Sequence, residues 1–159
     1  MLGDAGIARE VARSAPGLSQ AMNLLSAVAA VLEERLGLEL CVPEAIMCGC
    51  YPPKAHYRRH LDSYGPDDTR RVVTAILYAN EAWTPAMGGA FEYTDPTTGE
   101  VRTVDPVAGR LLLFKSRHVW HAVQESRTDR YAMTLWLWER EKRGCDAVLG
   151  PGGGEAGKM

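Results

Sequence analysis

The sequence predicts a mainly β domain, built as a sandwich or barrel and preceded by helices at the N-terminus. The first observation is a change of pattern: residues 1–40 read as helical, whereas residues 42–139 contain short segments rich in Val, Tyr, Thr, Leu and Trp. The second is the length of 159 residues, which fits one domain. The third is the composition, because 46% hydrophobic and 24% charged residues are ordinary for a globular chain and unlike a disordered one.

The N-terminal segment, residues 1–41, is expected to form two helices that support the β domain. The first, over residues 7–13, is expected to end before Pro16-Gly17, because this dipeptide breaks helices. The second begins with Ser19 as its N-cap and ends at Gly37, which suits a left-handed C-terminal cap. Its apolar residues recur at steps of three and four and define one face: Met22, Leu25, Val28, Ala29, Leu32 and Leu36.

The β domain is expected to cover residues 42–140. Turn sequences rich in Pro, Gly, Asp and Asn divide it at intervals of about 8–12 residues, which is typical of a sandwich or barrel. The predicted strands are 45–51, 56–62, 70–79, 89–94, 101–104, 110–114, 118–124 and 130–138. Residues 144–159 contain Pro-Gly-Gly-Gly and few apolar side chains, and are expected to be a disordered tail.

Charge and cysteine content exclude several classes of protein. The 18 Lys and Arg against 20 Asp and Glu give a net charge of −2, which argues against a nucleic-acid-binding protein. No apolar run approaches the roughly 18 residues of a membrane span. The four cysteines lack a CxxC pair, no secretory signal is recognisable, and we expect a reducing compartment, cytoplasmic or nuclear. The cysteines are interpreted as small buried residues, apart from Cys145 in the tail.

Two histidines and one aspartate form the sharpest motif. His60 and Asp62 are two residues apart on a predicted strand, so their side chains are expected on the same face. His121 lies on a later strand. Two imidazoles and a carboxylate form the facial triad of non-haem Fe(II) oxygenases, which leaves metal positions open for other ligands. Each residue taken alone has an ordinary alternative, since a single histidine is more often structural and a single aspartate more often caps a turn.

Arg130 follows His121 by nine residues and begins the last predicted strand. On this strand Arg130 is expected to face the interior together with Ala132, Thr134 and Trp136. The alternate residues, Tyr131, Met133, Leu135 and Leu137, are expected to pack against the N-terminal helix. A buried arginine is costly unless it meets an anion, and its planar fork suits a carboxylate.

Tyr78 is the other candidate for binding that carboxylate. It shares a strand face with Val72, Thr74 and Ile76, and its hydroxyl is able to supply a second hydrogen bond. The arginine pairs at 58–59 and 70–71 are expected to be solvated. His56 and His118 are not expected to be ligands.

As a set, these residues resemble the Fe(II)- and 2-oxoglutarate-dependent prolyl hydroxylases of the hypoxia-inducible-factor type and their bacterial relatives. The resemblance covers about residues 44–139. The matching stretches are Cys50-Tyr51-Pro52, Tyr57 to Asp62, Ile76 to Asn80 with Trp83, Gly88-Gly89, Leu111 to Phe114, His121-Ala122-Val123 and Arg130 to Trp136.

The resemblance implies a fold and a set of roles. The fold is a double-stranded β-helix, a cupin-like jelly-roll barrel. His60, Asp62 and His121 are then the iron ligands and the catalytic centre. Arg130 and Tyr78 hold the distal carboxylate of 2-oxoglutarate, and Tyr51 lies near this co-substrate. Thr134 and Trp136 line the same pocket.

The function that the resemblance implies is hydroxylation of a prolyl residue in a protein or peptide, with release of succinate and CO2. The cofactors expected are Fe(II), 2-oxoglutarate and O2, with ascorbate to keep the iron reduced. One alternative is a related oxygenase that acts on a small molecule or on another side chain. Another is a cupin-like metal-binding module without catalysis. The sequence identifies neither the substrate nor the oligomeric state.

Overall fold

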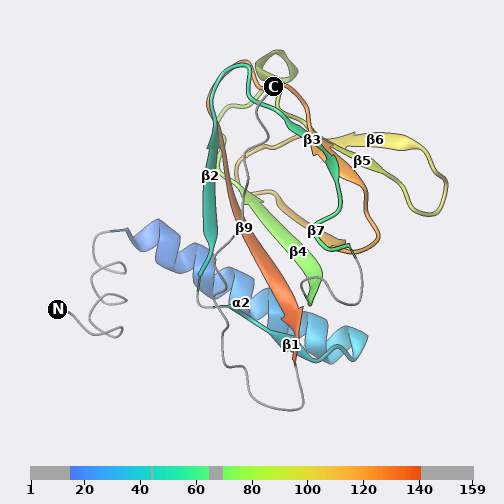
Figure 1. Ribbon diagram of the computed structural model, residues 1–159. Helices are drawn as coiled ribbons and strands as arrows, with labels where there is room; N and C mark the ends of the chain where they lie inside the picture. The colour runs from blue at the N-terminus through green and yellow to red at the C-terminus, as the bar shows by residue number, and fades with distance from the viewer. Residues whose placement is uncertain (1–14, 44, 65–69, 141–159) are drawn as a thin grey trace.

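One long helix and two antiparallel sheets make up the fold (Figure 1). The structure is a computed structural model and describes residues 15–43, 45–64 and 70–140. The helix expected over residues 7–13 and the tail expected over 144–159 lie outside these residues. The elements are α2 (Pro16–Leu36), β1 (Leu40–Cys41), β2 (Met47–Tyr51), β3 (Tyr57–His60), β4 (Arg71–Tyr78), η1 (Pro85–Met87), β5 (Phe91–Thr94), β6 (Val101–Val104), β7 (Leu111–Lys115), β8 (His121–Val123) and β9 (Arg130–Glu139). The mainly β class with a supporting helix is confirmed.

The larger sheet is organised around β9, its longest strand. Its order is β1-β9-β4-β7, and β2 also pairs with β9. The ten residues of β9 pair with β4 along one side, and with β2 and then β1 along the other. The smaller sheet has the order β3-β8-β5-β6. Within the described residues the two sheets remain separate, so the jelly roll consists of two facing walls rather than a closed barrel.

The helix α2 starts earlier than the sequence suggested. Pro16 occupies its first turn with Ala15 as N-cap, and Ser19 lies inside the helix rather than capping it. Proline is tolerated in the first turn because the N–H it lacks would have no partner there, so Pro16 begins the helix instead of breaking it. Gly37 ends it as expected, with φ of 62° and its N–H donating to the Glu33 carbonyl. Among the described residues, no helix is long and apolar enough to cross a membrane.

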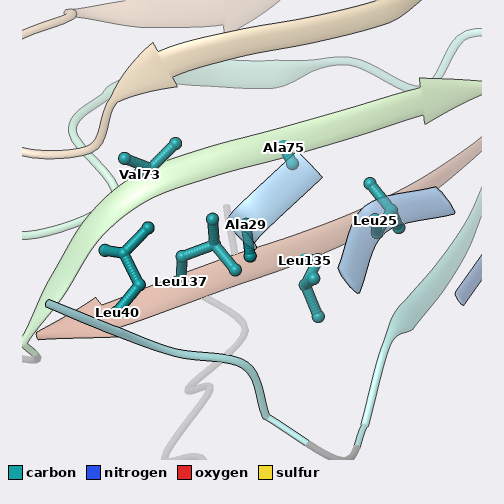
Figure 2. Close-up of a cluster of buried hydrophobic side chains, with 7 residues drawn as sticks. All are labelled: Leu25, Ala29, Leu40, Val73, Ala75, Leu135 and Leu137. Atoms are coloured by element: carbon teal, nitrogen blue, oxygen red, sulfur yellow. The ribbon is translucent and has the colours of Figure 1, made fainter. Parts of the chain in front are cut away.

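The main core lies between α2 and the larger sheet. Leu25 and Ala29 of the helix meet Leu135 and Leu137 of β9 (Figure 2). Both β9 leucines are 0% exposed, and burying such a side chain contributes about 1.5–3 kcal/mol. The complete cluster is Leu25, Ala29, Leu40, Val73, Ala75, Leu135 and Leu137. The predicted face of the helix is confirmed at its centre, whereas Leu36 near its end is 61% exposed.

The eight predicted strands correspond to β2 through β9, with differences of a few residues at the ends. The additional strand β1 has two residues and is too short to produce a sequence pattern. β3 ends at His60, so Asp62 lies beyond the strand instead of two residues along it. The Asp62 backbone N–H donates to the Ser116 carbonyl at 3.1 Å, and this contact brings the chain back toward the site.

Candidate active site

A cavity of about 270 Å³ lies between the two sheets. The larger sheet contributes Tyr51, Thr134 and Trp136 to its walls, while the smaller sheet contributes His60, Phe91 and His121. The alternation of side chains along each strand therefore directs residues of both sheets into one shared cavity.

The candidate metal ligands converge in this cavity. The possible ligand atoms of His60, Asp62 and His121 all lie within 4.8 Å of one another. Asp62 Oδ1 is 3.5 Å from His60 Nε2 and 3.7 Å from His121 Nε2. Each ring uses its other nitrogen on a backbone carbonyl, His60 Nδ1 on Arg58 at 2.8 Å and His121 Nδ1 on Val119 at 3.0 Å. Because a carbonyl only accepts, Nδ1 of each ring donates to it, which leaves Nε2 as the nitrogen available to a metal.

The smaller sheet fixes the two imidazoles relative to each other. His60 and His121 are opposite one another in the β3–β8 register, and their ring centroids are 4.1 Å apart. His121 is also stacked on Phe91 at 5.1 Å and meets the edge of Phe114 at 4.8 Å. Burial lowers the pKa of His121, so the ring is held in the neutral form that binds metals. Neither phenylalanine was predicted from the sequence to belong to the site.

Asp62 is held as an ionised carboxylate with one oxygen directed at the histidines. Burial alone would raise its pKa, but the neighbouring His60, the hydrogen bond from Thr74 and the nearby His121 together outweigh burial, and the pKa lies below its usual value. Thr74 Oγ1 donates to Asp62 Oδ2 at 2.6 Å and lies 2.8 Å from Ser116 Oγ. Oδ1 is therefore the oxygen that faces the histidines. The role of Thr74 was missed, although its place on the Tyr78 face of β4 was a usable signal.

Arg130 supplies a buried positive charge to the same cavity. Its side chain is 3% exposed, and Nε donates to the Gly89 carbonyl at 2.7 Å. Its Cζ lies 5.2 Å from the Tyr51 ring centroid and 5.1 Å from that of Tyr78. Burial lowers the pKa of Arg130, and the two tyrosines partly oppose this shift. Among the described residues no carboxylate pairs with this guanidinium, so an anionic ligand would supply the missing counter-charge.

Tyr78 lies behind Arg130 and is 1% exposed. Within the described part of the chain its buried hydroxyl has no hydrogen-bond partner. Burial raises the pKa of Tyr78 to about 12, so the hydroxyl keeps its proton at neutral pH and is able to donate. Tyr51 lines the cavity itself, and burial raises its pKa too, against the opposing charge of Arg130.

The opposite part of the cavity contains Thr134, Trp136 and Arg71. Thr134 and Trp136 line the wall where the sequence placed them. Arg71, which was expected to be solvated, also lines the cavity, because its guanidinium lies 4.2 Å above the Trp136 ring. This stacking explains the difference, since an arginine plane packs favourably on an aromatic face.

The expectation that the cysteines are buried was wrong for Cys48 and Cys50, which are exposed.

The residues present fit Fe(II) and a dicarboxylate co-substrate. Two imidazoles and one carboxylate are the donor set of non-haem iron, and three protein ligands leave positions for other groups. The orphaned Tyr78 hydroxyl and the unpaired Arg130 guanidinium form a receptor for a carboxylate. Thr74 contacts the metal cluster through Asp62, and Tyr78 belongs to the carboxylate receptor. The two residues are four positions apart on β4, so the metal cluster and the receptor are separated by about 13 Å of strand.

Comparison with known proteins agrees with this chemistry. The family model of the 2OG-Fe(II) oxygenase superfamily matches residues 46–138. Prolyl hydroxylase EGLN3 of Mus musculus is 38% identical over 100 residues, which are 61% of this chain and 41% of that protein. The crystal structure of a Pseudomonas putida prolyl-4-hydroxylase superposes with a TM-score of 0.71 at 36% identity, covering 80% of this chain and 68% of the other.

A third similarity is to a prolyl hydroxylase from Trichoplax adhaerens, solved in complex with a peptide fragment of the hypoxia inducible factor oxygen degradation domain. Its TM-score is 0.68 at 31% identity, with 77% of this chain and 56% of the other covered. The present chain spans about two fifths of the length of the mouse relative. The family match extends over more than half of the chain and includes every candidate ligand. The chain therefore belongs to the 2OG-Fe(II) oxygenase superfamily, within its prolyl hydroxylase family, whose cofactors are Fe(II), 2-oxoglutarate and O2.

Proposed function

We propose that this protein hydroxylates a prolyl residue of a protein or peptide, and that it converts 2-oxoglutarate and O2 to succinate and CO2 in the process. The observation that carries the proposal is the presence of two complementary groups in one cavity. His60, Asp62 and His121 form a metal-binding cluster, and Arg130 adds a buried, unpaired cation. The prolyl hydroxylase relatives support the choice of proline.

Each group has a distinct role in the proposal. His60, Asp62 and His121 hold iron, which when bound supplies the oxidising chemistry. Arg130 and Tyr78 hold the far carboxylate of 2-oxoglutarate, with Tyr51 beside them. Thr74 keeps Asp62 in one rotamer through its 2.6 Å hydrogen bond. These contacts fix the reactants before reaction, which is the main contribution of a protein to cofactor chemistry.

The mouth of the cavity suits a peptide. Met47 and Tyr57 line the cavity and are 45% and 50% exposed, so its wall continues to the surface as an apolar rim. A peptide in an extended conformation is able to bind along this rim and place a prolyl residue at the opening of the cavity. The Trichoplax relative, whose structure contains a peptide, supports a substrate of this class.

The first test is an anaerobic titration with Fe(II) and then 2-oxoglutarate. We expect a visible charge-transfer band only when both are present. Arg130→Ala should weaken 2-oxoglutarate binding about 100-fold while iron binding is retained, because it removes a buried charged hydrogen-bonding group. Arg102→Ala is the control, since Arg102 lies on β6 and pairs with Asp95 and Glu100. A folded protein that takes up iron but gives no band would favour a non-catalytic metal-binding module.

The second test concerns the substrate. Succinate production should rise when proline-containing peptides are added, and mass spectrometry should find one added oxygen on the prolyl residue. Alanine replacements of the same prolines are the control. Stimulation by small molecules instead of peptides would identify a related oxygenase of another class.

We also propose that ascorbate sustains turnover. We propose a cytoplasmic or nuclear location, where the exposed thiols of Cys48 and Cys50 would stay reduced.

A further inference from the structure

We infer that Gly89 is a positioning residue for the co-substrate, because its lack of a side chain sets the place of the Arg130 guanidinium. This inference rests on the proposed function only in assigning the carboxylate to Arg130. The contact between the two residues is independent of that function. Gly88-Gly89 belongs to the motif found in the sequence, and the Gly89 carbonyl is the acceptor for Arg130 Nε.

The backbone at Gly89 is anchored at both of its polar groups. Its N–H donates to the Glu125 carbonyl at 2.9 Å, and its carbonyl accepts from Arg130 Nε at 2.7 Å. Its φ is +72°, a conformation that other residues rarely adopt. The segment is therefore fixed while Arg130 lies across it.

The space beside Gly89 is filled by the stem of Arg130. A Cβ at this position would lie 2.8 Å from Arg130 Cδ and 3.1 Å from Ser126 Oγ. Side-chain carbons do not approach a neighbour as closely as 2.8 Å, so an atom must move. Ser126 is 1% exposed and its hydroxyl donates to the Thr128 carbonyl at 2.7 Å, so Ser126 has little freedom. The arginine side chain is the partner that has to shift.

A shifted Arg130 would lose the geometry that a carboxylate receptor needs. The hydrogen bond from Nε to the Gly89 carbonyl fixes one edge of the guanidinium, and the Tyr78 side chain interacts with the same group. The same bond holds Cζ near 5 Å from the rings of Tyr51 and Tyr78. Two parallel hydrogen bonds to a carboxylate depend on this orientation. Gly89 acts on the co-substrate through Arg130.

The test compares Gly89→Ala with Gly99→Ala. Gly99 has nearly the same φ, +74°, but a Cβ there would meet nothing within 4 Å, so it controls for backbone strain alone. In the anaerobic titration, Gly89→Ala should weaken 2-oxoglutarate at least about tenfold and leave iron affinity within about twofold. Gly99→Ala should change both affinities by less than about twofold. The inference is overturned if the two variants bind 2-oxoglutarate alike, or if Gly89→Ala weakens iron as much as 2-oxoglutarate.

A double-mutant cycle with Arg130→Ala tests the route of the effect. Truncating Arg130 removes the atom that the new methyl group meets, so Gly89→Ala should lower the melting temperature of the metal-free protein less in that background. It should also weaken 2-oxoglutarate no further. Equal losses in both backgrounds would show that Gly89 does not act through Arg130.

Two further outcomes are decided by the same variants. If Gly89→Ala alone fails to fold, the double variant should recover the fold, and its failure to do so would overturn the inference. If the unmodified protein gives no charge-transfer band, the proposed function fails. The melting-temperature cycle still decides whether Gly89 places Arg130.

Discussion

The two faces of β9 differ in chemistry although they belong to the same ten residues. On one face, Leu135 and Leu137 are fully buried and belong to the apolar core cluster with Leu25 and Ala29 of α2 (Figure 2). On the other, Arg130, Thr134 and Trp136 line the cavity between the sheets. The first face is closed and apolar, while the second carries a buried charge that no carboxylate among the described residues neutralises.

The difference shows how one strand separates stability from ligand binding. Because side chains alternate with a period of two, α2 covers Leu135 and Leu137 while the alternate side chains remain available to a ligand. The prediction that Tyr131 also packs against the helix was wrong, since Tyr131 is 47% exposed at the start of the strand. A substitution on the helix face should therefore change stability and spare binding. A substitution on the cavity face should do the reverse.

The largest expected effect belongs to the cavity. Asp62→Ala removes one of three ligands and should abolish iron-dependent succinate formation. The melting temperature of the metal-free protein should change by only a few degrees, since the Asp62 side chain lies outside the core cluster between α2 and the larger sheet. Activity and iron content are measured against Asp105→Ala, which alters an exposed carboxylate. Normal turnover in Asp62→Ala would refute the assignment of the ligands.

The next effect belongs to the helix face. Leu135→Ala should lower the free energy of unfolding by about 2–5 kcal/mol, because it leaves a cavity at a fully buried position. The 2-oxoglutarate affinity of the remaining folded protein should be unchanged. Denaturant unfolding measures the loss, with Leu113→Ala as control, since Leu113 is 38% exposed. A large loss of affinity without a loss of stability would contradict the separation of the two faces.

Thr74→Val tests a supporting contact with a smaller effect. Valine keeps the shape of the side chain but removes the hydrogen bond to Asp62 Oδ2. The iron affinity should fall about 10–100-fold, which is typical when a partner of a metal ligand is lost. Metal titration measures the change, and Thr103→Val on β6 is the control, because Thr103 is exposed. Unaltered iron affinity would mean that the histidines alone orient Asp62.

The alternation of β9 and the order of the ligands were predictable from the sequence, because both depend on local periodicity and residue type. The burial of Leu135 and the interior position of Arg130 follow from this pattern. Asp62 was correctly predicted to lie beside His60, but the two residues do not belong to one strand as expected. The chain leaves β3 at His60, and the Ser116 carbonyl, 54 residues away, anchors the following turn.

Contacts between distant segments account for the other differences. The role of Thr74 depends on Asp62, twelve residues earlier in the chain. The roles of Arg71 and Gly89 depend on Trp136 and Arg130, which are much farther away in the sequence. The contacts of Arg71 and Gly89 leave no periodic signal in a single sequence, whereas the alternation along β4 already placed Thr74 on the same face as Tyr78. The wrong prediction at Pro16 has a local cause. Pro-Gly was interpreted as a helix breaker, although proline is also favoured in the first turn of a helix, where Pro16 lies.

The ionisation of Tyr78 should have the smallest effect, because it changes the stability of the fold only at alkaline pH. The pKa of Tyr78 is raised from 10.0 to about 12 by burial. Below pH 10 both the folded and the unfolded chain keep the proton, and the stabilisation linked to this group is fully present. As the pH rises from 10 to 12, the unfolded chain loses the proton first, so stability should fall through this window.

Tyr78→Phe removes that titration and should make unfolding less dependent on pH between 10 and 12. Denaturant unfolding across this range, compared with Tyr64→Phe at a 62% exposed position, measures the difference. Equal slopes in Tyr78→Phe and the unmodified protein would show that the hydroxyl titrates normally and is not confined behind Arg130. A reduced slope, joined to weaker 2-oxoglutarate binding at neutral pH, would tie the orphaned hydroxyl to the carboxylate receptor. The buried side chain of Tyr78 would then contribute both to the stability of the fold and to the binding of 2-oxoglutarate.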